Sequence, residues 1–293
     1  MTSASATCWR SRRCSCDQRA SCPGSRPAKV GELEVLPVLD GYGYEIAREV
    51  LLSPEAGDTD PWASHSGHLD PRGRPEFTLG GFLVRTGDRV ILVDTGAGTI
   101  DNGQYKGGQL LDSLRACGVT PDDVTDVVFT HLHFDHVGWA AAKGEVVFRN
   151  ATYRVHEADW AYFVERPEAA PGAVRKLSPV KPQLETLSGE CVLAPGLNAR
   201  PAPGHTPGST IYILSGGTQR VLPLGDVVHS TVELIEPGWQ FAFDEDRAAA
   251  AAMRQQISTE LLDSQDVAAA AHFLDPWFGR LVTAEASRQW IFM

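Results

Sequence analysis

The hydrophobic pattern becomes regular from Val30 onward, where short apolar runs alternate with turn residues. Apolar runs of this length, bounded by Gly, Pro, Asn or Asp, are typical of buried strands. The triplet Thr86-Gly87-Asp88 separates two such runs and therefore predicts a hairpin. The pattern predicts strands over 30–39, 77–85, 89–94, 124–130, 146–148, 152–155, 199–202, 210–214, 219–224 and 267–271.

Helical signals occur in three segments. The Ala-rich run 244–262 carries the clearest one, because alanine has the highest helix propensity and Asp244 can cap the first turn. Segment 109–117 has leucines at helical spacing and is followed by Gly118, while 157–163 predicts a shorter helix. Strands in both halves, with helices between and after them, indicate an α/β fold of two mixed sheets with helices on the outer faces.

Two Gly- and Pro-rich segments interrupt this order. Because residues 166–185 are rich in Pro, we expect them to form an excursion of the chain over the protein surface. Residues 53–76, which contain His65 and His68, predict a surface loop, with a lid over a site as the alternative. No internal repeat or linker divides the body, so we expect a single domain over 29–293.

Residues 1–28 differ in composition from the rest of the chain. They hold five Arg and one Asp, show no hydrophobic period and lack the apolar run of a secretory signal, so we expect a disordered tail. Four cysteines crowd this tail without C-x₂-C spacing. We interpret them as reduced thiols of a cytoplasmic protein, with a structural zinc site as the weaker alternative.

The charge balance restricts the partners. The net charge is −11, and outside the tail 21 Lys and Arg stand against 36 Asp and Glu. Such an acidic body offers no basic surface to phosphate backbones or anionic lipids. No apolar run approaches the roughly 18 residues of a transmembrane helix. We therefore expect a small-molecule substrate and no binding to nucleic acid or membrane.

Four candidate metal ligands stand within the stretch 131–136, directly after a predicted strand. In an extended segment alternate residues point the same way, so His131 and His133 can bind one ion. Asp135 and His136 follow at the turn and can reach a second ion. Imidazole and carboxylate ligands suit Zn, Mn, Fe or Co. A group of solvated surface histidines is the alternative.

Three further candidates follow predicted strands elsewhere in the chain. His205 lies in the Pro- and Gly-rich loop 203–208, which can hold its imidazole in one direction. Asp226 and His272 each come directly after an apolar run. Any one of them alone is more often structural. Together with H-x-H-x-D-H, however, they predict a two-metal site.

This order of ligands, H-x-H-x-D-H followed by His, Asp and His, resembles the metallo-β-lactamase superfamily over nearly all of residues 30–293. The resemblance implies a four-layer αβ/βα sandwich with the metal site at one edge of the two sheets. It implies two divalent ions, with Zn²⁺ expected first and Mn, Fe or Co as alternatives. The implied ligands are His131, His133 and His205 for one ion, Asp135, His136 and His272 for the other, and Asp226 as a bridge.

Longer stretches are similar to the branch that contains methyl parathion hydrolase and the quorum-quenching lactonases. They are His136-Val-Gly-Trp139, His156-Glu-Ala-Asp-Trp160, Gly225-Asp-Val-Val-His-Ser230 and Ala271-His-Phe-Leu-Asp-Pro-Trp-Phe-Gly-Arg280. The resemblance implies a hydrolase that cleaves a small lactone, ester or phosphotriester with a hydroxide held between two metals. It also implies that Asp94 supports the ligand loop, although an Asp that caps a turn is nearly as good an interpretation.

Candidate catalytic residues are Asp135, Asp226 and His229. Acyl-homoserine lactonases usually carry Tyr at the position of His229, three residues after the bridging Asp, which puts homoserine lactones in doubt as substrates. His229 is either a proton or hydrogen-bond donor or a structural histidine. Candidates for the walls of an apolar pocket are Phe134, Trp139 and Trp160, with core packing as the alternative.

Other activities of the same fold remain alternatives. A glyoxalase II-like thioesterase keeps all seven ligands but also needs a helical C-terminal region, and 21 residues follow His272. A mononuclear-iron dioxygenase would bind a single iron, so metal stoichiometry separates it from a two-metal hydrolase. A non-enzymatic chain of this fold would usually have lost ligands. A homodimer is common in this branch, but no interface is visible in the sequence.

Overall fold

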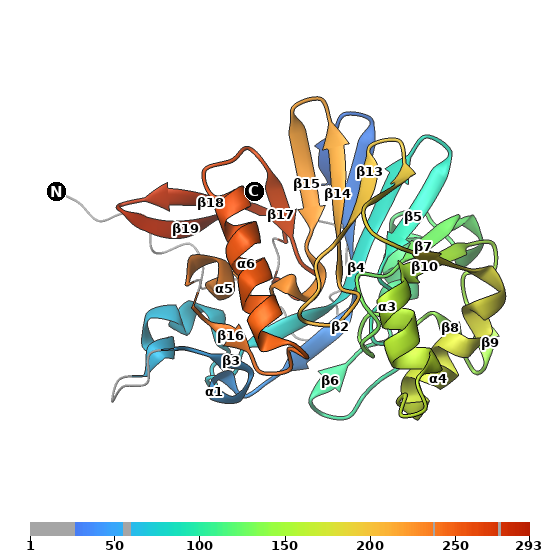
Figure 1. The fold of residues 1–293 in the computed structure, drawn as a ribbon, viewed down its shortest axis with the longest axis horizontal. Coiled ribbons are helices and arrows are strands. Elements are labelled where there is room, and N and C mark those ends of the chain that lie inside the picture. Colours follow the sequence, from blue (N-terminus) through green and yellow to red (C-terminus); the bar gives the residue numbers. More distant parts are fainter. Residues whose placement is uncertain (1–26, 55–59, 237, 275–276) are drawn as a thin grey trace.

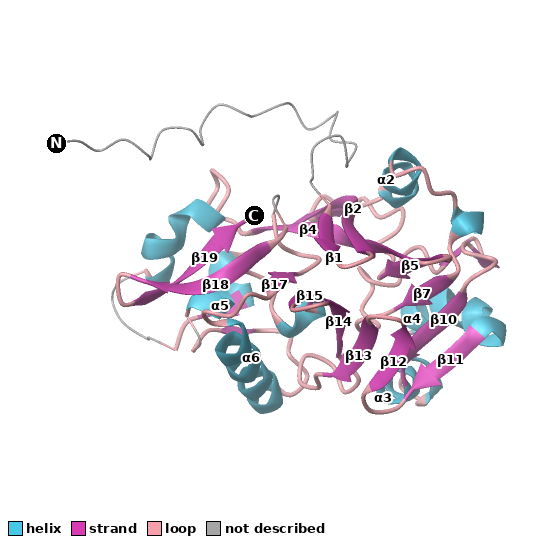
Figure 2. Ribbon diagram, turned by 90° about the horizontal axis from the view of Figure 1, so that it is seen from above, coloured by secondary structure: helices cyan, strands magenta, loops and turns pink. Residues whose placement is uncertain are grey.

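The computed structural model describes residues 27–54, 60–236, 238–274 and 277–293. Two large mixed sheets lie face to face with helices outside them (Figures 1 and 2), which confirms the predicted α/β sandwich. Almost all of the predicted tail lies outside the described residues, and the first described strand begins at Ala28. None of the described helices is long and apolar enough to cross a membrane.

The first sheet has eight strands and is antiparallel at one end and parallel at the other. The pairs β5–β7, β7–β10 and β10–β11 are parallel, whereas β1, β2, β4 and β5 pair antiparallel in turn. Its strands in spatial order are β1 (Ala28–Val30), β2 (Leu33–Tyr44), β4 (Glu76–Thr86), β5 (Arg89–Val93), β7 (Asp126–Val128), β10 (Thr152–His156) and β11 (Leu184–Leu187), with β6 (Tyr105–Lys106) beside β2.

The second sheet has seven strands, and β15–β17 is its parallel pair. In spatial order they are β12 (Cys191–Ala194), β13 (Leu197–Pro201), β14 (Thr210–Gly216), β15 (Gln219–Pro223), β17 (Val267–Ala269), β18 (Gly279–Ala284) and β19 (Ser287–Phe292). Two small ribbons complete the strands: β3 (Leu51–Leu52) with β16 (Gln240–Phe241), and β8 (Ala141–Ala142) with β9 (Glu145–Val146).

Parallel neighbours need a crossover connection, and a helix forms part of this connection for the pairs β5–β7 and β15–β17. Helix α2 (Leu110–Ala116) lies between β5 and β7 in the chain, and α6 (Arg247–Leu261) lies between β15 and β17. Figure 2 shows α2 on one side of the paired sheets and α6 on the other. The shorter helices are α1 (Ala47–Val50), α3 (Glu157–Trp160), α4 (Pro171–Leu177) and α5 (Val232–Ile235).

The first sheet buries both of its faces, which explains its continuous apolar runs. Successive side chains of a strand point to opposite faces. Accordingly, Val84 and Ile91 pack in the core shared with the second sheet, whereas Leu83 and Leu92 pack in the core that includes Leu110 of α2. These two cores hold the sheets and helices in the order that places the strand ends of both sheets at one edge.

Several predicted strand boundaries were wrong. The predicted strand 30–39 is a hairpin of β1 and β2 with Gly31 at the turn, where φ is +58°. The left-handed backbone favours glycine there, and the apolar pattern does not reveal the turn. The predicted strand 124–130 pairs only as β7, because the residues after it form the ligand loop. Of 146–148, only Val146 belongs to a strand.

The helix predicted over 244–262 begins later, at Arg247. Its N-cap is Asp246, whose carboxylate accepts a hydrogen bond from the Ala249 N–H at 3.0 Å, and Asp244 has another role described below. The Pro-rich excursion 166–185 also needs correction. It contains α4 and a 3₁₀ helix (Ser178–Gln183), and it buries apolar side chains against the first sheet.

Candidate metal centre

The candidate ligands come together because they follow the carboxyl ends of neighbouring strands. The loop with His131 and His136 follows β7, while Asp226 follows β15 and His272 follows β17. His205 stands in the connection between β13 and β14. Ends of parallel strands meet at one edge of a sheet, so β7 and the β15–β17 pair deliver their ligands to the same place.

Three histidine nitrogens of the first group face one another. His133 Nδ1 lies 3.0 Å from His131 Nε2 and 2.9 Å from His205 Nε2. Together with Asp226 these atoms lie within 4.8 Å of one another. Nitrogen lone pairs at such distances repel each other unless a proton or a cation lies between them. This geometry fits a divalent ion bound by three imidazoles and a carboxylate.

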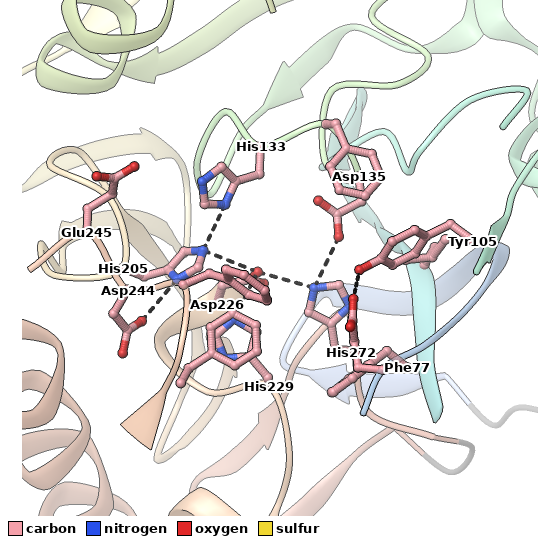
Figure 3. A pocket seen from close by; sticks show the side chains of 15 residues that line it. Phe77, Tyr105, His133, Asp135, His205, Asp226, His229, Asp244, Glu245 and His272 are labelled. Atoms are coloured by element: carbon pink, nitrogen blue, oxygen red, sulfur yellow. Dashed lines mark hydrogen bonds and ion pairs between the residues drawn. The ribbon is translucent and has the colours of Figure 1, made fainter. Parts of the chain in front are cut away.

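Asp135, His136 and His272 form the second group, whose ligand atoms also lie within 4.8 Å of one another. Asp226 stands between the groups. Its Oδ1 is 3.3 Å from His136 Nε2, and its Oδ2 is 3.2 Å from His272 Nε2 and 3.5 Å from His131 Nε2. A carboxylate that faces both groups is placed to bridge two ions (Figure 3).

The residues present fit two divalent ions. His136 Nε2 and Asp226 Oδ1 are buried without a hydrogen-bond partner, a costly state that a coordinated cation would relieve. Burial lowers the pKa of His133 to about 3 and that of His131 well below its ordinary value, so both rings offer lone pairs at neutral pH. Burial also opposes the charge on His136, yet Asp226 and Asp94 raise its pKa well above the usual value. The carboxylates therefore attract positive charge to this point.

In three of the histidines, the ring nitrogen Nδ1, which points away from the other ligands, has an oxygen partner that fixes the direction of the ring. His136 Nδ1 lies 2.9 Å from Asp94 Oδ2, and His272 Nδ1 lies 2.8 Å from the Thr78 carbonyl oxygen. His205 Nδ1 lies 3.1 Å from Asp244 Oδ1. An oxygen acceptor at Nδ1 holds the proton there and leaves Nε2 free for a metal.

Asp94 performs the supporting task that the resemblance implied. Its carboxylate accepts hydrogen bonds from the Thr130 N–H at 2.8 Å and from the Thr130 hydroxyl at 2.7 Å, besides its contact with His136. The Asp94 backbone adopts a left-handed conformation with φ of 61°. This residue therefore joins the end of β5 to the start of the ligand loop.

Asp159 joins the ligand loop to the His205 loop, and sequence analysis did not identify this role. Its side chain accepts hydrogen bonds from the Leu132 N–H, the Gly208 N–H and the Thr206 hydroxyl at 3.2, 2.6 and 3.0 Å. Burial raises the pKa of Asp159 to about 6. The stretch His156–Trp160 is similar to the branch that contains methyl parathion hydrolase and the lactonases, but no periodicity distinguishes Asp159 within it.

A cavity of about 570 Å³ opens above the metal ligands, large enough for a small organic molecule. None of the described residues that line it is Lys or Arg. Glu245 lies at one side and Tyr105 at the other (Figure 3). The lining residues are Glu45, Phe77, Leu79, Tyr105, His133, Phe134, Asp135, His205, Asp226, His229, Phe241, Phe243, Asp244, Glu245 and His272.

Of the three aromatic residues predicted for the pocket, the structure places one there. Phe134 lines the cavity, is 48% exposed, and contacts the Tyr105 ring edge-on with centroids 5.2 Å apart. Trp139 and Trp160 are packed in the hydrophobic core instead, and their indole nitrogens donate to Asp40 and Glu165. Their placement in the pocket was therefore wrong, because large aromatic side chains add most to stability when they are buried.

In the segment with His65 and His68, none of the described residues (53–54 and 60–76) lines the cavity. Residues Pro61–His68 form a 3₁₀ helix, and Trp62 packs edge-on against Trp239 at 5.0 Å between ring centroids. His65 Nε2 lies 3.4 Å from a carboxylate oxygen of Glu236. The contacts of this segment are those of a packed surface element rather than of a lid.

His229 lies beside the metal ligands. Its Nε2 is 3.2 Å from Asp226 Oδ2, its ring stacks on Phe241 with centroids 3.3 Å apart, and 2% of the residue is exposed. Burial opposes the charged form, but the Asp226 carboxylate raises the pKa of His229 to about 9. The ring is therefore a candidate donor at the cavity floor.

Two packed sheets with seven His and Asp ligands at their common edge define a protein that can hold a pair of divalent metal ions. The chain belongs to the Metallo-beta-lactamase superfamily, whose family profile matches residues 81–272, more than half of its length.

Relatives with described activities include lactonases. The N-acyl homoserine lactonase AiiA of Bacillus thuringiensis subsp. kurstaki is 28% identical over 194 residues, which cover 59% of this chain and 73% of that protein. Metallo-beta-lactamase domain-containing protein 1 of Mus musculus is 31% identical over 203 residues, which cover 67% of this chain and 65% of that protein.

Solved structures show the same fold. AidC, described as a dizinc quorum-quenching lactonase, is 26% identical with a TM-score of 0.79, and the match covers 92% of this chain and 97% of that one. The hydrolase AbOPH is 24% identical with a TM-score of 0.80 over 93% of this chain and 98% of that one.

Proposed function

We propose that this protein is a two-metal hydrolase that opens a small, uncharged lactone or ester. The observation that carries the proposal is a set of seven candidate metal ligands, five of which line a cavity with aromatic walls, while none of the described lining residues is Lys or Arg. The described lining residues therefore offer no Lys or Arg side chain to pair with an anionic substrate. The lactonase activity described for AiiA and AidC supports ring opening as the reaction.

The chemistry requires an activated water and a stabilised carbonyl oxygen. Two divalent ions held by these ligands would lower the pKa of a bound water from about 15.7 toward 7 and would polarise a carbonyl group. Asp226 orients both groups of ligands, and Asp135 Oδ2, 3.5 Å from His272 Nε2, faces the same floor. His229 is placed to donate a proton or hydrogen bond to the oxygen of the broken C–O bond.

The apolar side of the cavity accounts for the orientation of the substrate. Phe134 and Phe243 are 48% and 59% exposed, so their rings are available for contact with the apolar part of a substrate. The Tyr105 hydroxyl donates to the Glu45 carboxylate and lies at the same cavity. Contacts of this kind place the carbonyl over the metal ligands and exclude water from the acyl group.

The test is metal analysis of the purified protein, combined with a screen over lactones, aryl esters, thioesters and phosphotriesters. We expect about two ions per chain and metal-dependent turnover of lactones or esters. Preference for a phosphotriester or for a glutathione thioester would replace the proposed substrate class. One iron per chain without hydrolysis would refute the proposal and favour a dioxygenase.

The control for this screen is the Asp226→Ala variant. It should lose at least one ion and reduce turnover by about 100-fold or more, because it lacks the carboxylate shared by both groups. Full metal occupancy with unchanged turnover in this variant would show that Asp226 is not the bridge.

A further inference from the structure

Arg254 is the largest fully buried side chain in the described part of the molecule, and it lies directly behind the metal centre. It stands on the core-facing side of α6, which also buries Ala250, Ile257 and Leu261. An isolated charge in such a place is strongly unfavourable, so an arginine here needs partners.

Two buried carboxylates flank the guanidinium. Arg254 Nη2 donates to Asp244 Oδ2 at 2.7 Å, and Nη1 lies 3.4 Å from Glu233 Oε1. Nη1 also donates to the carbonyl oxygen of Val227 at 3.2 Å, next to Asp226 in the chain. The arginine therefore joins three segments around the site.

Each carboxylate has a histidine on its other side. Asp244 Oδ1 lies 3.1 Å from His205 Nδ1. Glu233 Oε2 lies 3.6 Å from His229 Nδ1 and accepts the His229 backbone N–H at 2.6 Å. Arg254 is thus the centre of a chain of contacts that runs from a metal ligand to the proposed donor at the cavity floor.

We propose that Arg254 is a positioning residue that orients His205 through Asp244 and His229 through Glu233. The Asp244 carboxylate keeps the proton on His205 Nδ1 and leaves Nε2 for a metal. The Glu233 carboxylate accepts from the His229 backbone N–H and faces the His229 ring, so it fixes the position of that ring. Arg254 holds both carboxylates in place, since its planar guanidinium can contact both at once. The His229 branch of this proposal rests on the proposed hydrolase function.

The two branches predict different defects, which a merely structural role would not produce. Asp244→Asn should lower zinc affinity by about 10- to 100-fold, measured by competition with a chelator, because it weakens the orientation of a metal ligand. Glu233→Gln should keep zinc affinity within about threefold and lower kcat by about tenfold or more, with little change in KM, because His229 acts only in the reaction.

Arg254→Met should show both defects, and Arg254→Lys should recover part of each. The matched control is Arg200→Met, which removes an ion pair between β13 and Glu260 on α6, at 3.0 Å, without touching the site. We expect this control to keep zinc affinity and kcat. If Arg254→Met does not fold, the split between Asp244→Asn and Glu233→Gln decides the question.

Equal and small effects in Asp244→Asn and Glu233→Gln, or wild-type zinc affinity and kcat in a folded Arg254→Met, would overturn the proposal. If the wild-type protein hydrolyses no compound of the screen, the proposed function fails, while zinc affinity still tests the His205 branch. For the other branch, ¹⁵N-histidine NMR should show that Glu233→Gln shifts the signals of the His229 ring nitrogens, and unshifted signals would contradict it.

Discussion

Asp94 shows how one residue can combine backbone and side-chain demands at a metal centre. A left-handed φ of 61° is uncommon outside glycine but tolerated by Asp and Asn. This conformation turns the chain at the end of β5 and places the carboxylate against Thr130 and His136. An amide at this position would fit the backbone, yet it could not accept from all three donors at once.

We therefore predict that Asp94→Asn folds normally but loses zinc affinity by about 10- to 100-fold, because His136 loses the acceptor that fixes its tautomer. Chelator competition measures the affinity, and circular dichroism checks the fold. Asp112→Asn is the control, since the Asp112 side chain is 64% exposed. Unchanged zinc affinity in Asp94→Asn would show that this carboxylate does not tune the metal ligand.

Among the secondary-structure elements, the parallel strands β5, β7 and β10 position the loop that contains His131 and His136. Asp126 at the start of β7 contacts Arg89 on β5 and Arg154 on β10. This carboxylate is 3% exposed and joins the three strands at the end opposite to the ligand loop. Its ion pairs complement the apolar packing that aligns the strand ends.

We predict that Asp126→Asn lowers the free energy of unfolding by about 2 kcal/mol near pH 7, because two arginines lose their shared partner. Burial opposes ionisation of Asp126, but hydrogen bonds from Arg89 and Thr125 lower its pKa below the ordinary 3.8. The ionised form therefore stabilises the fold above pH 3.8, and this contribution disappears as the pH falls through the lowered pKa.

Urea unfolding of metal-free wild type and Asp126→Asn across pH 3 to 7 measures this difference. The difference in free energy of unfolding between the two proteins should become smaller as the pH falls below about 4. Both proteins are measured without metal, so that loss of metal at low pH adds nothing to the difference and the free ligand histidines titrate alike in both. A difference in free energy of unfolding that stays constant over this range would contradict the role of the Asp126 charge.

At the scale of the whole molecule, the two sheets meet at an edge where neither sheet alone could form the site. The first sheet supplies His131, His133, Asp135 and His136, and the second supplies His205, Asp226 and His272. Bound metal would therefore join the two halves of the molecule in addition to their shared core. A ligand that binds only the folded state stabilises it in proportion to the logarithm of its concentration.

We predict that removal of metal lowers Tm. Zinc at about 1,000 times its dissociation constant contributes about 4 kcal/mol, which corresponds to a Tm difference of roughly 8 °C for a chain of this size. Calorimetry with and without chelator measures the difference, and added zinc should restore it. A Tm that does not depend on metal would mean that the ligands of the two sheets do not share ions.

The amino-acid pattern alone was enough to predict the α/β class, most strand positions and the seven candidate metal ligands, because short apolar runs, the H-x-H-x-D-H spacing and single His or Asp residues after predicted strands are local signals. Which residues surround those candidate ligands depends instead on the three-dimensional packing of the chain. Asp244 has the local signature of a helix cap but acts on His205, Trp139 and Trp160 pack in the core, and Arg254 joins residues distant in the chain. Long-range packing determines such contacts, and no spacing along the chain encodes it.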